Sequence, residues 1–445
     1  MKYKQSKFNL MEYDENGDLL VINTLKLEPI KITSEKISSF NEIIGGQNTK
    51  IDDKLTSRLI DLGIIVPIER DEIKLVEMKH NEVVYGTDTL NVEIIPTNDC
   101  NFDCSYCFEK SSKDYMSSAT ASKVINFFKR EIPHCKTVRI DWFGGEPLLC
   151  KDIILQIGEA VEKICRENRV ALFGTISTNG YLLDLDLFKK LINIKIYEFQ
   201  ICVDGPRHMH NKTRPHKSDP DSYEKIINNL LAIKKNVKST AFSLGIRCNI
   251  TPNVEPFLPE YLQTMQKYFA DDSRFFILFQ SVRDWGGEKI SKDSIPENES
   301  RLYKKWYSEA RKLGLHCADM LKPAPFVGYC TGNRKNGYVI NYDGSLHKCS
   351  LALHSNYKDI NRLGDISDDG KKIIDEAQLS QWLVHLESHE SKCKSCNMFP
   401  LCVGGFCFFQ HHIKGIHKCD TSYLTVVREY LLSLNDRDKI KYWEM

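Results

Sequence analysis

The middle of the chain alternates short apolar runs with amphipathic helical patterns. A helical stretch over 118–131, with Ala121, Val124 and Phe128 on one face, is typical of the segments between these runs. A repeated order of strand and then helix predicts a parallel sheet with right-handed crossovers. The six predicted strands are 91–96, 137–142, 170–176, 197–203, 241–250 and 274–280.

A different pattern precedes this region. Residues 18–32, "DLLVINTLKLEPIKI", predict two short strands of a hairpin. Helical patterns follow at 34–44, closed by Gly45 and Gly46, and at 52–62, closed by Gly63. These elements predict a small, separate α+β unit, and the charged segment 69–88 is interpreted as a linker.

After about residue 300 the alternation stops, and the sequence becomes rich in cysteine and turn residues. This composition favours a core held by ligands over one held by apolar packing. The cysteines of this region are Cys330, Cys349, Cys393, Cys396, Cys402, Cys407 and Cys419.

Composition narrows the class of protein. The 445 residues include 61 basic and 60 acidic ones, and a net charge of +1 gives no general attraction to nucleic acid or to an anionic membrane. The first residues contain no apolar export signal, and no segment has the roughly 20 apolar residues of a membrane span. A cytoplasmic location is therefore expected, where sixteen cysteines indicate metal or cluster ligands more than disulfides.

Three of the cysteines, Cys100, Cys104 and Cys107, follow the first predicted parallel strand with C-x3-C-x2-C spacing. Polar loops also follow the next three strands, and the carboxyl ends of parallel strands share one edge of the sheet. Three thiolates on such a loop fit a [4Fe–4S] cluster with one iron open to a ligand. The alternative is a zinc ion with a distant fourth ligand.

These motifs resemble those of the radical S-adenosylmethionine superfamily over residues 90–445. The resemblance implies that Cys100, Cys104 and Cys107 bind a [4Fe–4S] cluster and that its open iron chelates S-adenosylmethionine. Cleavage of that cofactor gives a 5′-deoxyadenosyl radical. The fold implied is a partial (β/α)6 TIM barrel within an α/β class. The cofactor contacts implied by position are Tyr106, Gly144, Gly145, Glu146, Cys202 and Arg214.

Two of these motifs differ in how closely they follow the family. "FGGEP" (143–147) resembles the glycine-rich strand end that contacts the methionine amino group, and a tight turn at a coincidental position is the alternative. "CVDGPRHMHNKTR" (202–214) resembles the S-x-D-G-x4-H-x3-R segment, with Arg214 at its end. Cys202 stands where the family usually has Ser, which weakens hydrogen bonding there, and a small buried thiol is the alternative role.

The cysteine-rich region resembles the SPASM domain, which binds two auxiliary [4Fe–4S] clusters. Its pattern is followed except that "CVGGFC" has C-x4-C in place of C-x3-C. By position, one auxiliary cluster takes Cys393, Cys396, Cys402 and Cys419. The other auxiliary cluster is assigned Cys330, Cys349 and Cys407 and has no obvious fourth thiolate. Cys317 is the nearby unassigned cysteine that could be its fourth ligand.

The remaining cysteines and the nearby histidines are interpreted as residues that bind no metal. Most of the cysteines without ligand spacing are expected in the core, and the histidines are expected on the surface or in hydrogen bonds. The cysteines are Cys135, Cys150, Cys165, Cys202, Cys248 and Cys317, and the histidines are His411, His412 and His417.

The N-terminal pattern resembles the RiPP recognition element, a winged-helix relative that binds a leader peptide as an added strand. Many winged helices share this pattern, so a generic wing or an architectural role stays open. The resulting domains are 1–85 for the recognition element and linker, 90–305 for the barrel and 306–445 for the SPASM region. Fusion of the three is the combination found in peptide maturases.

The resemblance implies a maturase that abstracts hydrogen from a precursor peptide and forms a thioether or carbon–carbon cross-link. A flavodoxin or ferredoxin would supply the electron. A second hypothesis is a formylglycine-forming anaerobic sulfatase maturase, but that family has Asp directly after the G-x4-C cysteine, where this chain has Ser350. A non-catalytic iron–sulfur carrier would not need an open iron, "FGGEP" or Arg214. A zinc-binding nucleic-acid module is disfavoured because no basic aromatic cluster accompanies the cysteines.

Overall fold

The structure of the protein is a computed structural model in which the chain divides into two compact units. The N-terminal unit comprises residues 1–85, 319–333 and 383–445, and the barrel unit comprises 86–318 and 334–382. The residues that the structure describes are 2–45, 54–285, 289–318, 330–355, 357–384, 391–403, 407–409, 415, 427–428 and 430–431.

The N-terminal unit is built on a three-stranded antiparallel sheet in the order β2-β3-β4. The predicted hairpin is confirmed by β3 and β4, which pair antiparallel from Leu19 opposite Ile32 to Ile22 opposite Pro29. A second antiparallel pair joins β1 to β5. The elements are β1 (Tyr3–Gln5), β2 (Asn9–Tyr13), β3 (Leu19–Asn23), β4 (Pro29–Ile32), η1 (Ser34–Lys36), α1 (Ile37–Ile44), α2 (Lys54–Asp61), β5 (Ile65–Pro67), α3 (Glu72–Tyr85), η7 (Thr331–Asn333), α13 (Ser391–Ser395) and α14 (Phe399–Cys402).

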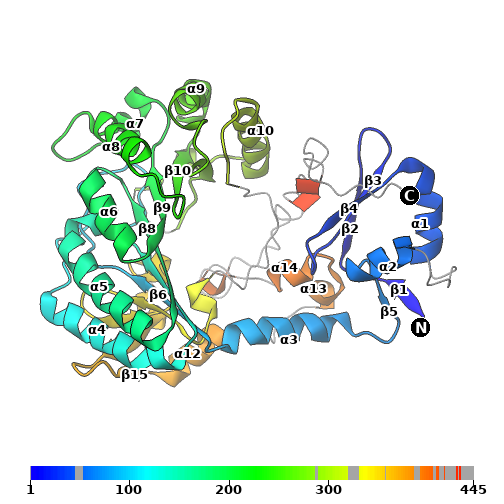
Figure 1. Ribbon diagram of the computed structural model, residues 1–445, viewed down its shortest axis with the longest axis horizontal. Helices are drawn as coiled ribbons and strands as arrows, with labels where there is room; N and C mark the ends of the chain where they lie inside the picture. Colours follow the sequence, from blue (N-terminus) through cyan, green and yellow to red (C-terminus); the bar gives the residue numbers. More distant parts are fainter. Residues whose placement is uncertain are drawn as a thin grey trace. The chain divides into compact units, whose positions relative to one another are not determined.

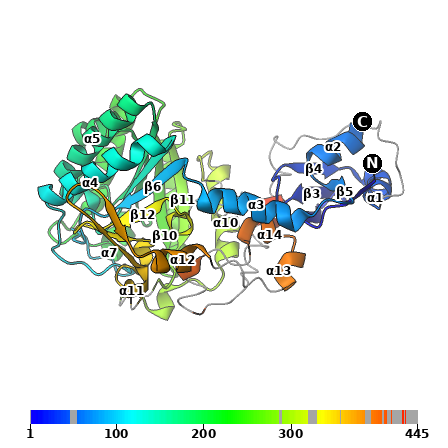
Figure 2. The ribbon, with the colours of Figure 1, turned by 90° about the horizontal axis from the view of Figure 1, so that it is seen from below.

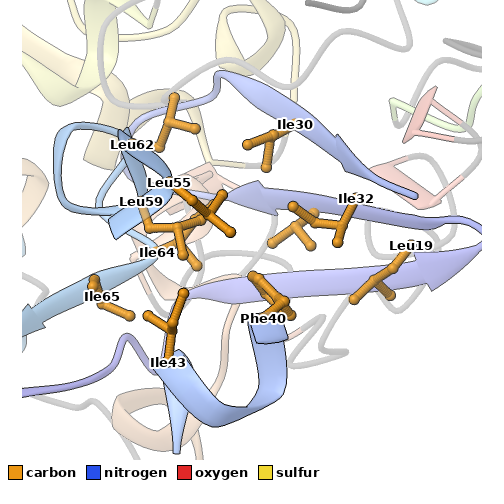
Figure 3. Packing of buried hydrophobic residues seen from close by; sticks show 11 residues of the cluster. Leu19, Ile30, Ile32, Phe40, Ile43, Leu55, Leu59, Leu62, Ile64 and Ile65 are labelled. Atoms are coloured by element: carbon orange, nitrogen blue, oxygen red, sulfur yellow. The ribbon is translucent and has the colours of Figure 1, made fainter. Parts of the chain in front are cut away.

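One apolar cluster holds this sheet against its helices (Figure 3). Phe40 of α1 and Leu59 of α2 are both fully buried and lie over the side chains of Ile30 and Ile32 from β4. Alternation in the strands places these isoleucines on one face of the sheet, which is the face that the helices cover.

The segment 69–88, interpreted from its sequence as a linker, forms the helix α3 over most of its length, and α3 ends directly before the barrel unit begins. Asp71 accepts hydrogen bonds from the backbone amides of Ile73 and Lys74 at 3.1 Å, which satisfies donors at the start of the helix. Val76, His80 and Val84 recur at four-residue intervals and are buried. This narrow apolar stripe among charged residues gives a weak sequence signal although it suffices for packing.

The two edges of the three-stranded sheet differ. Beside β2, Asn397 donates from its side chain to the backbone oxygen of Asn9 at 3.4 Å. Strand β4 pairs with β3 alone among the described strands. Its Lys31 is 6% exposed, and its ammonium group lies 2.8 Å from Asp14 and 2.9 Å from Asp18. These ion pairs stabilise the buried ammonium group of Lys31 on the edge strand β4.

The barrel unit confirms the predicted α/β fold. Strands β6 to β11 pair in parallel and in sequence order, and each begins and ends within two residues of its predicted bounds. The strands are β6 (Thr89–Ile94), β7 (Thr137–Trp142), β8 (Ala171–Thr178), β9 (Ile196–Cys202), β10 (Ser243–Ile250) and β11 (Phe275–Ser281).

Helices α4, α5 and α6 lie along the outer face of these strands (Figure 1). Ser117 caps α4 by accepting from the amide of Thr120, and α4 has the predicted bounds of 118–131. The helices of the unit are α4 (Ser118–Glu131), η2 (Ile132–His134), η3 (Pro147–Cys150), α5 (Lys151–Asn168), α6 (Leu185–Asn193), α7 (Arg207–Thr213), α8 (Ser222–Asn236), η4 (Glu255–Phe257), α9 (Leu258–Phe269), η5 (Lys292–Ser294), α10 (Glu299–Lys312), η8 (Ser350–Ala352), α11 (Lys358–Asn361) and α12 (Glu376–Leu383).

The expectation of an irregular chain after residue 300 is also wrong for this unit. Four strands extend the parallel sheet beyond β6 to ten strands in total, with β12 parallel to β6 and the rest antiparallel (Figure 2). They are short and interrupted by turns, so no long periodic run reveals them in the sequence. They are β12 (Gly337–Ile340), β13 (Ser345–His347), β14 (Arg362–Ile366) and β15 (Lys372–Ile374).

Among the described residues no helix is long and apolar enough to cross a membrane.

The cluster in the N-terminal unit generates a stability prediction. Leu59→Ala removes a fully buried side chain, and we expect it to destabilise this unit by about 2–5 kcal/mol. Amide hydrogen exchange in β2–β4 should then accelerate. The exposed Lys54→Ala in the same helix is the control and should leave exchange unchanged. Equal exchange in the two variants would show that the cluster does not hold the sheet.

Candidate active site

The loop after β6 carries the three closely spaced cysteines at the carboxyl end of the parallel sheet. It is held by backbone hydrogen bonds to the segment after α7, in which Asp103 donates to Pro215 at 2.9 Å and Ser105 donates to Thr213 at 3.1 Å. Because 213–215 follow from the end of β9, the loops of two strands are fixed together.

The three thiols are shielded from water. Cys104 is 8% exposed, and Cys100 and Cys107 are partly buried. Burial raises the pKa of all three thiols, that of Cys100 to about 12, and the Glu146 carboxylate adds to the effect on Cys100. The thiolate forms therefore need a positive partner, which a metal cluster supplies.

No three of the described His, Cys, Asp and Glu side chains are arranged as ligands of a single ion. A cluster of several irons differs from one ion because each thiolate binds a separate iron. Cys100 and Cys107 are still close enough to Cys104 to raise its pKa, and Arg214 lowers the pKa of Cys104. This set of thiols beside a cation fits an anionic iron–sulfur cluster.

The predicted glycine pair lies against the cysteine loop. Gly144 has a φ of +119°, and a Cβ there would lie 2.6 Å from the Thr97 oxygen. A Cβ on Gly145 would lie 2.3 Å from the Asp99 oxygen. Backbone amides of Gly145 and Glu146 donate to Thr97 at 3.2 Å and to Asp99 at 2.8 Å. Only glycine permits this approach, so the pair fixes the start of the cysteine loop.

Glu146 is 1% exposed, and its carboxylate is hydrogen-bonded within the protein. Its carboxylate accepts from the Thr178 hydroxyl at 2.6 Å, from the Asn179 amide at 2.7 Å and from the Leu148 amide at 3.0 Å. These bonds join the end of β7 to the end of β8. Burial raises the pKa of Glu146 and the hydrogen bonds oppose that shift.

Tyr106, Arg214 and the fully buried Asp204 form one hydrogen-bonded group. The Tyr106 hydroxyl donates to Asp204, and it accepts from Arg214 at 2.7 Å and from the Asn249 side chain at 3.0 Å. Arg214 is 7% exposed, and its Nε has no hydrogen-bond partner among the described residues. That free donor, buried beside the cysteine loop, is suited to an anionic ligand.

Two further residues belong to this group. Cys202 ends β9 and lies opposite Arg247 in the sheet, where it acts electrostatically on Arg214. Asn249 of β10, which the sequence motifs did not nominate, donates to Asp204 from its backbone at 2.8 Å and from its side chain at 3.2 Å. Alternating polar residues in an otherwise apolar strand were the signal for Asn249.

The cysteines predicted to bind one auxiliary cluster lie in the N-terminal unit, apart from Cys419, which lies outside the described residues. Cys393 and Cys396 are in and just after α13, where the Cys396 amide donates to the Cys393 oxygen at 3.1 Å. Cys402 ends α14, and the next residue, Val403, has a φ of 44°. All three are partly buried.

The second predicted auxiliary set is divided between the units. Cys330 and Cys407 belong to the N-terminal unit and Cys349 to the barrel unit. Cys349 is fixed by the buried Asn361, whose side chain accepts from the Cys349 amide and donates to its oxygen, both at 2.8 Å.

The possible fourth ligand of that set, Cys317, bridges to Ile277 of β11, and it is close enough to the buried Tyr307 to raise the pKa of that phenol. Cys349 instead follows β13, which lies between β12 and β14 in the sheet.

The other cysteines are placed as core residues or near it. Cys150, Cys165 and Cys248 are buried, as expected, whereas Cys135 is partly exposed. His411, His412 and His417 lie outside the described residues.

Comparison with known proteins gives a family match within the barrel unit. Residues 94–249 match the model of the Radical SAM superfamily. A cysteine-type anaerobic sulfatase-maturating enzyme of Clostridium novyi (strain NT) is 22% identical over 338 residues, which cover 69% of this chain and 85% of that enzyme.

Two solved proteins share the fold. Native anSMEcpe with bound AdoMet is 21% identical, has a TM-score of 0.57 and covers 78% of this chain and 97% of its own. Streptococcus suis SuiB bound to S-adenosylmethionine is 16% identical, has a TM-score of 0.52 and covers 94% and 98% of the two chains. Both also have structures with peptide, Cp18Cys for anSMEcpe (TM-score 0.56, 22% identity) and the precursor SuiA for SuiB (TM-score 0.50, 17% identity).

The close approach of Gly145 to Asp99 generates a prediction. Gly145→Ala should displace the cysteine loop, because its Cβ would meet backbone atoms that cannot move alone. In apoprotein, Cys104 should then be alkylated faster, as measured by peptide mass spectrometry. The control is Gly245→Ala, whose Cβ would lie 2.9 Å from a movable Phe276 ring. An unchanged rate for Gly145→Ala would contradict this role.

Proposed function

We propose that the chain, a radical S-adenosylmethionine enzyme, modifies a residue of a ribosomally made precursor peptide and forms a thioether or carbon–carbon cross-link. The observation that carries the proposal is the set of three buried thiols beside Arg214 and the Gly144–Gly145 approach, at the carboxyl edge of the parallel sheet. The substrate class is proposed from the peptide-bound structures of anSMEcpe and SuiB.

In this proposal Cys100, Cys104 and Cys107 hold one [4Fe–4S] cluster, and S-adenosylmethionine binds at its open iron. Once bound, this pair supplies an electron and a sulfonium whose cleavage yields the 5′-deoxyadenosyl radical. The Arg214 Nε, which is buried without a partner, is available to a cofactor carboxylate. Tyr106 holds Arg214 in that direction, and Cys202 adds negative charge or a weak hydrogen bond nearby.

Glu146 is proposed to act through the loops and not as a direct contact of the cofactor. Its three hydrogen bonds fix the ends of β7 and β8. The backbone of Gly144 and Gly145 is then left close to the cysteine loop, where the methionine part of the cofactor is proposed to bind.

The two auxiliary [4Fe–4S] clusters are part of the proposal. Cys393, Cys396, Cys402 and Cys419 are assigned to one, and Cys330, Cys349 and Cys407 to the other. The partly buried state of the described members suits cluster ligands. The electron donor is proposed to be a flavodoxin or ferredoxin, and the protein is proposed to act in the cytoplasm.

The domains are proposed as 1–85, 90–305 and 306–445, with the first binding a leader peptide. A leader strand has one suitable position on the three-stranded sheet, which is β4, because the side chain of Asn397 already contacts β2. Backbone hydrogen bonds along β4 would supply affinity, and side-chain contacts would supply selectivity.

Formylglycine formation is the second candidate, and the relative from Clostridium novyi is the observation that favours it. It is weakened by Ser350, because a hydroxyl is a poor proton acceptor compared with the Asp of that family. Analysis of the modified peptide by mass distinguishes formylglycine from a cross-link.

The cysteine loop is tested by replacing Cys100, Cys104 and Cys107 together with Ala. Formation of 5′-deoxyadenosine under a strong reductant should be abolished, because no donor remains beside the sulfonium. Iron per chain should fall from about twelve to about eight if both auxiliary clusters remain. Cys135→Ala is the control, and zinc in place of iron, or cleavage by the triple variant, would contradict the proposal.

The leader site is tested by hydrogen exchange with the leader of a candidate precursor, which is to be sought among short reading frames next to this gene. Amides of β4 should become protected, because an added strand satisfies their outward groups. Strand β1 provides an internal control that should not change. Protection confined to other elements would place leader recognition elsewhere.

A further inference from the structure

Three strands of the barrel carry polar side chains at one level of their inner face. Glu93 of β6 pairs in register with Asp141 of β7, and Asp141 pairs with Thr175 of β8. Strand alternation places them on the face opposite to the buried Val92 and Ile140. No motif identified in the sequence includes any of the three.

The carboxyl groups of Glu93 and Asp141 are held differently. The Thr175 hydroxyl donates to Asp141, whereas the hydroxyl of Ser350 donates to Glu93. Ser350 directly follows Cys349, so Glu93 connects the first strand of the barrel to the segment that carries a proposed auxiliary ligand. Glu93 also feels the charge of Glu109, two residues after Cys107. Glu93 therefore lies between the cysteine loop and the Cys349 segment.

A second observation shows that this face has unused hydrogen-bonding capacity. Asn91 precedes Glu93 by two residues on the same face of β6 and is 8% exposed. Its Nδ2 has no hydrogen-bond partner among the described residues. A buried amide donor without a partner is costly unless a ligand satisfies it. The inner face at this level is thus suited to a polar substrate group.

The charges around Glu93 favour its protonated form. Burial raises the pKa of Glu93 to about 8, the carboxylates of Asp141 and Glu109 add to the rise, and the Ser350 hydroxyl opposes it. A carboxyl group that titrates near neutral pH is matched to proton transfer with a substrate.

We propose that Glu93 is the proton acceptor for the substrate residue that enters the barrel, with Asp141 and Ser350 as positioning residues; this rests on the proposed function. The step is a proton transfer only. A substrate S–H, N–H or O–H bond breaks, the proton bonds to a Glu93 carboxylate oxygen, and the electron pair stays on the substrate heteroatom. That atom is then a better nucleophile for bond formation.

Glu93 is assigned this role ahead of Asp141 for two reasons. Burial raises the pKa of Asp141, but the Thr175 hydroxyl and the Arg139 guanidinium both oppose that rise, so Asp141 has a cationic neighbour within the sheet. For Glu93 the Ser350 hydroxyl opposes the rise, and Glu93 is nearer in the chain to the cysteine loop. The two carboxyl groups titrate as an interacting pair.

The first test needs no substrate. Infrared difference spectra between pH 6 and pH 9.5 of the holoenzyme should show loss of a protonated carboxyl band with a midpoint near pH 8. Glu93→Gln should remove this band. Asp141→Asn should move the midpoint to lower pH, because a repelling charge is lost, and Ser350→Ala should move it higher, because a stabilising donor is lost. A band unchanged in Glu93→Gln overturns the proposal.

The second test measures modification of the candidate precursor peptide as a function of pH. The rate should rise through pH 8, because a group with a raised pKa becomes a proton acceptor only above it. Glu93→Gln should lose the rise and slow modification about 10²-fold, while 5′-deoxyadenosine still forms. Glu167→Gln, which changes an exposed carboxylate of the outer helix α5, is the control.

The two tests separate the proposals. If the wild-type enzyme shows the Glu93 band but modifies no peptide, the proposed peptide substrate is refuted. The proposal that Glu93 accepts a proton then still stands. Modification by Glu93→Gln with the wild-type pH profile refutes the role of Glu93 and leaves the maturase function. If Glu93→Gln does not fold, the test uses the pH midpoint of the carboxyl band in Asp141→Asn and in Ser350→Ala, which should shift in opposite directions. Equal midpoints in these two variants overturn the proposal.

Discussion

The buried carboxylate of Asp204 is the constraint on which the barrel mouth depends. It is fully removed from water, and an unpaired charge in that position would cost several kcal/mol. Its partners come from the cysteine loop through Tyr106, from β10 through Asn249 and from the end of α7 through Arg214. Satisfying one charge thus fixes three segments that are distant in the sequence. The positions of the thiols follow from this arrangement and from the close contact at Gly145.

Much of the fold could be predicted because its main elements repeat a strong pattern. The six parallel strands and α4 are long, apolar on a regular period and bounded by turn or cap residues. Helix α3 was missed because its buried stripe is only one residue wide per turn and is surrounded by charge. Strands β12 to β15 were missed because three to five residues carry too little periodicity, and their pairing partners are supplied by the sheet.

Some residues of the candidate site could likewise be nominated from the sequence, and others could not. Cys100, Gly145 and Arg214 were predictable because each lies in a motif whose spacing is set by chemistry. Asn249 and Glu93 are single polar residues within strands, and their importance depends on neighbours in register, which spacing along the chain does not reveal. Glu146 was nominated for the cofactor, and spacing along the chain could not reveal the three hydrogen bonds that join it to strand ends.

Lys31 gives the open edge of the N-terminal sheet a further property. An unpaired strand can join the same strand of another copy, and such pairing starts aggregation. A lysine held inward by Asp14 and Asp18 would lose those partners if the edge were flattened against an identical neighbour. Two copies would also bring two ammonium groups together. Among the described strands β4 pairs with β3 alone, and its ion-paired lysine disfavours pairing of that edge with an identical copy.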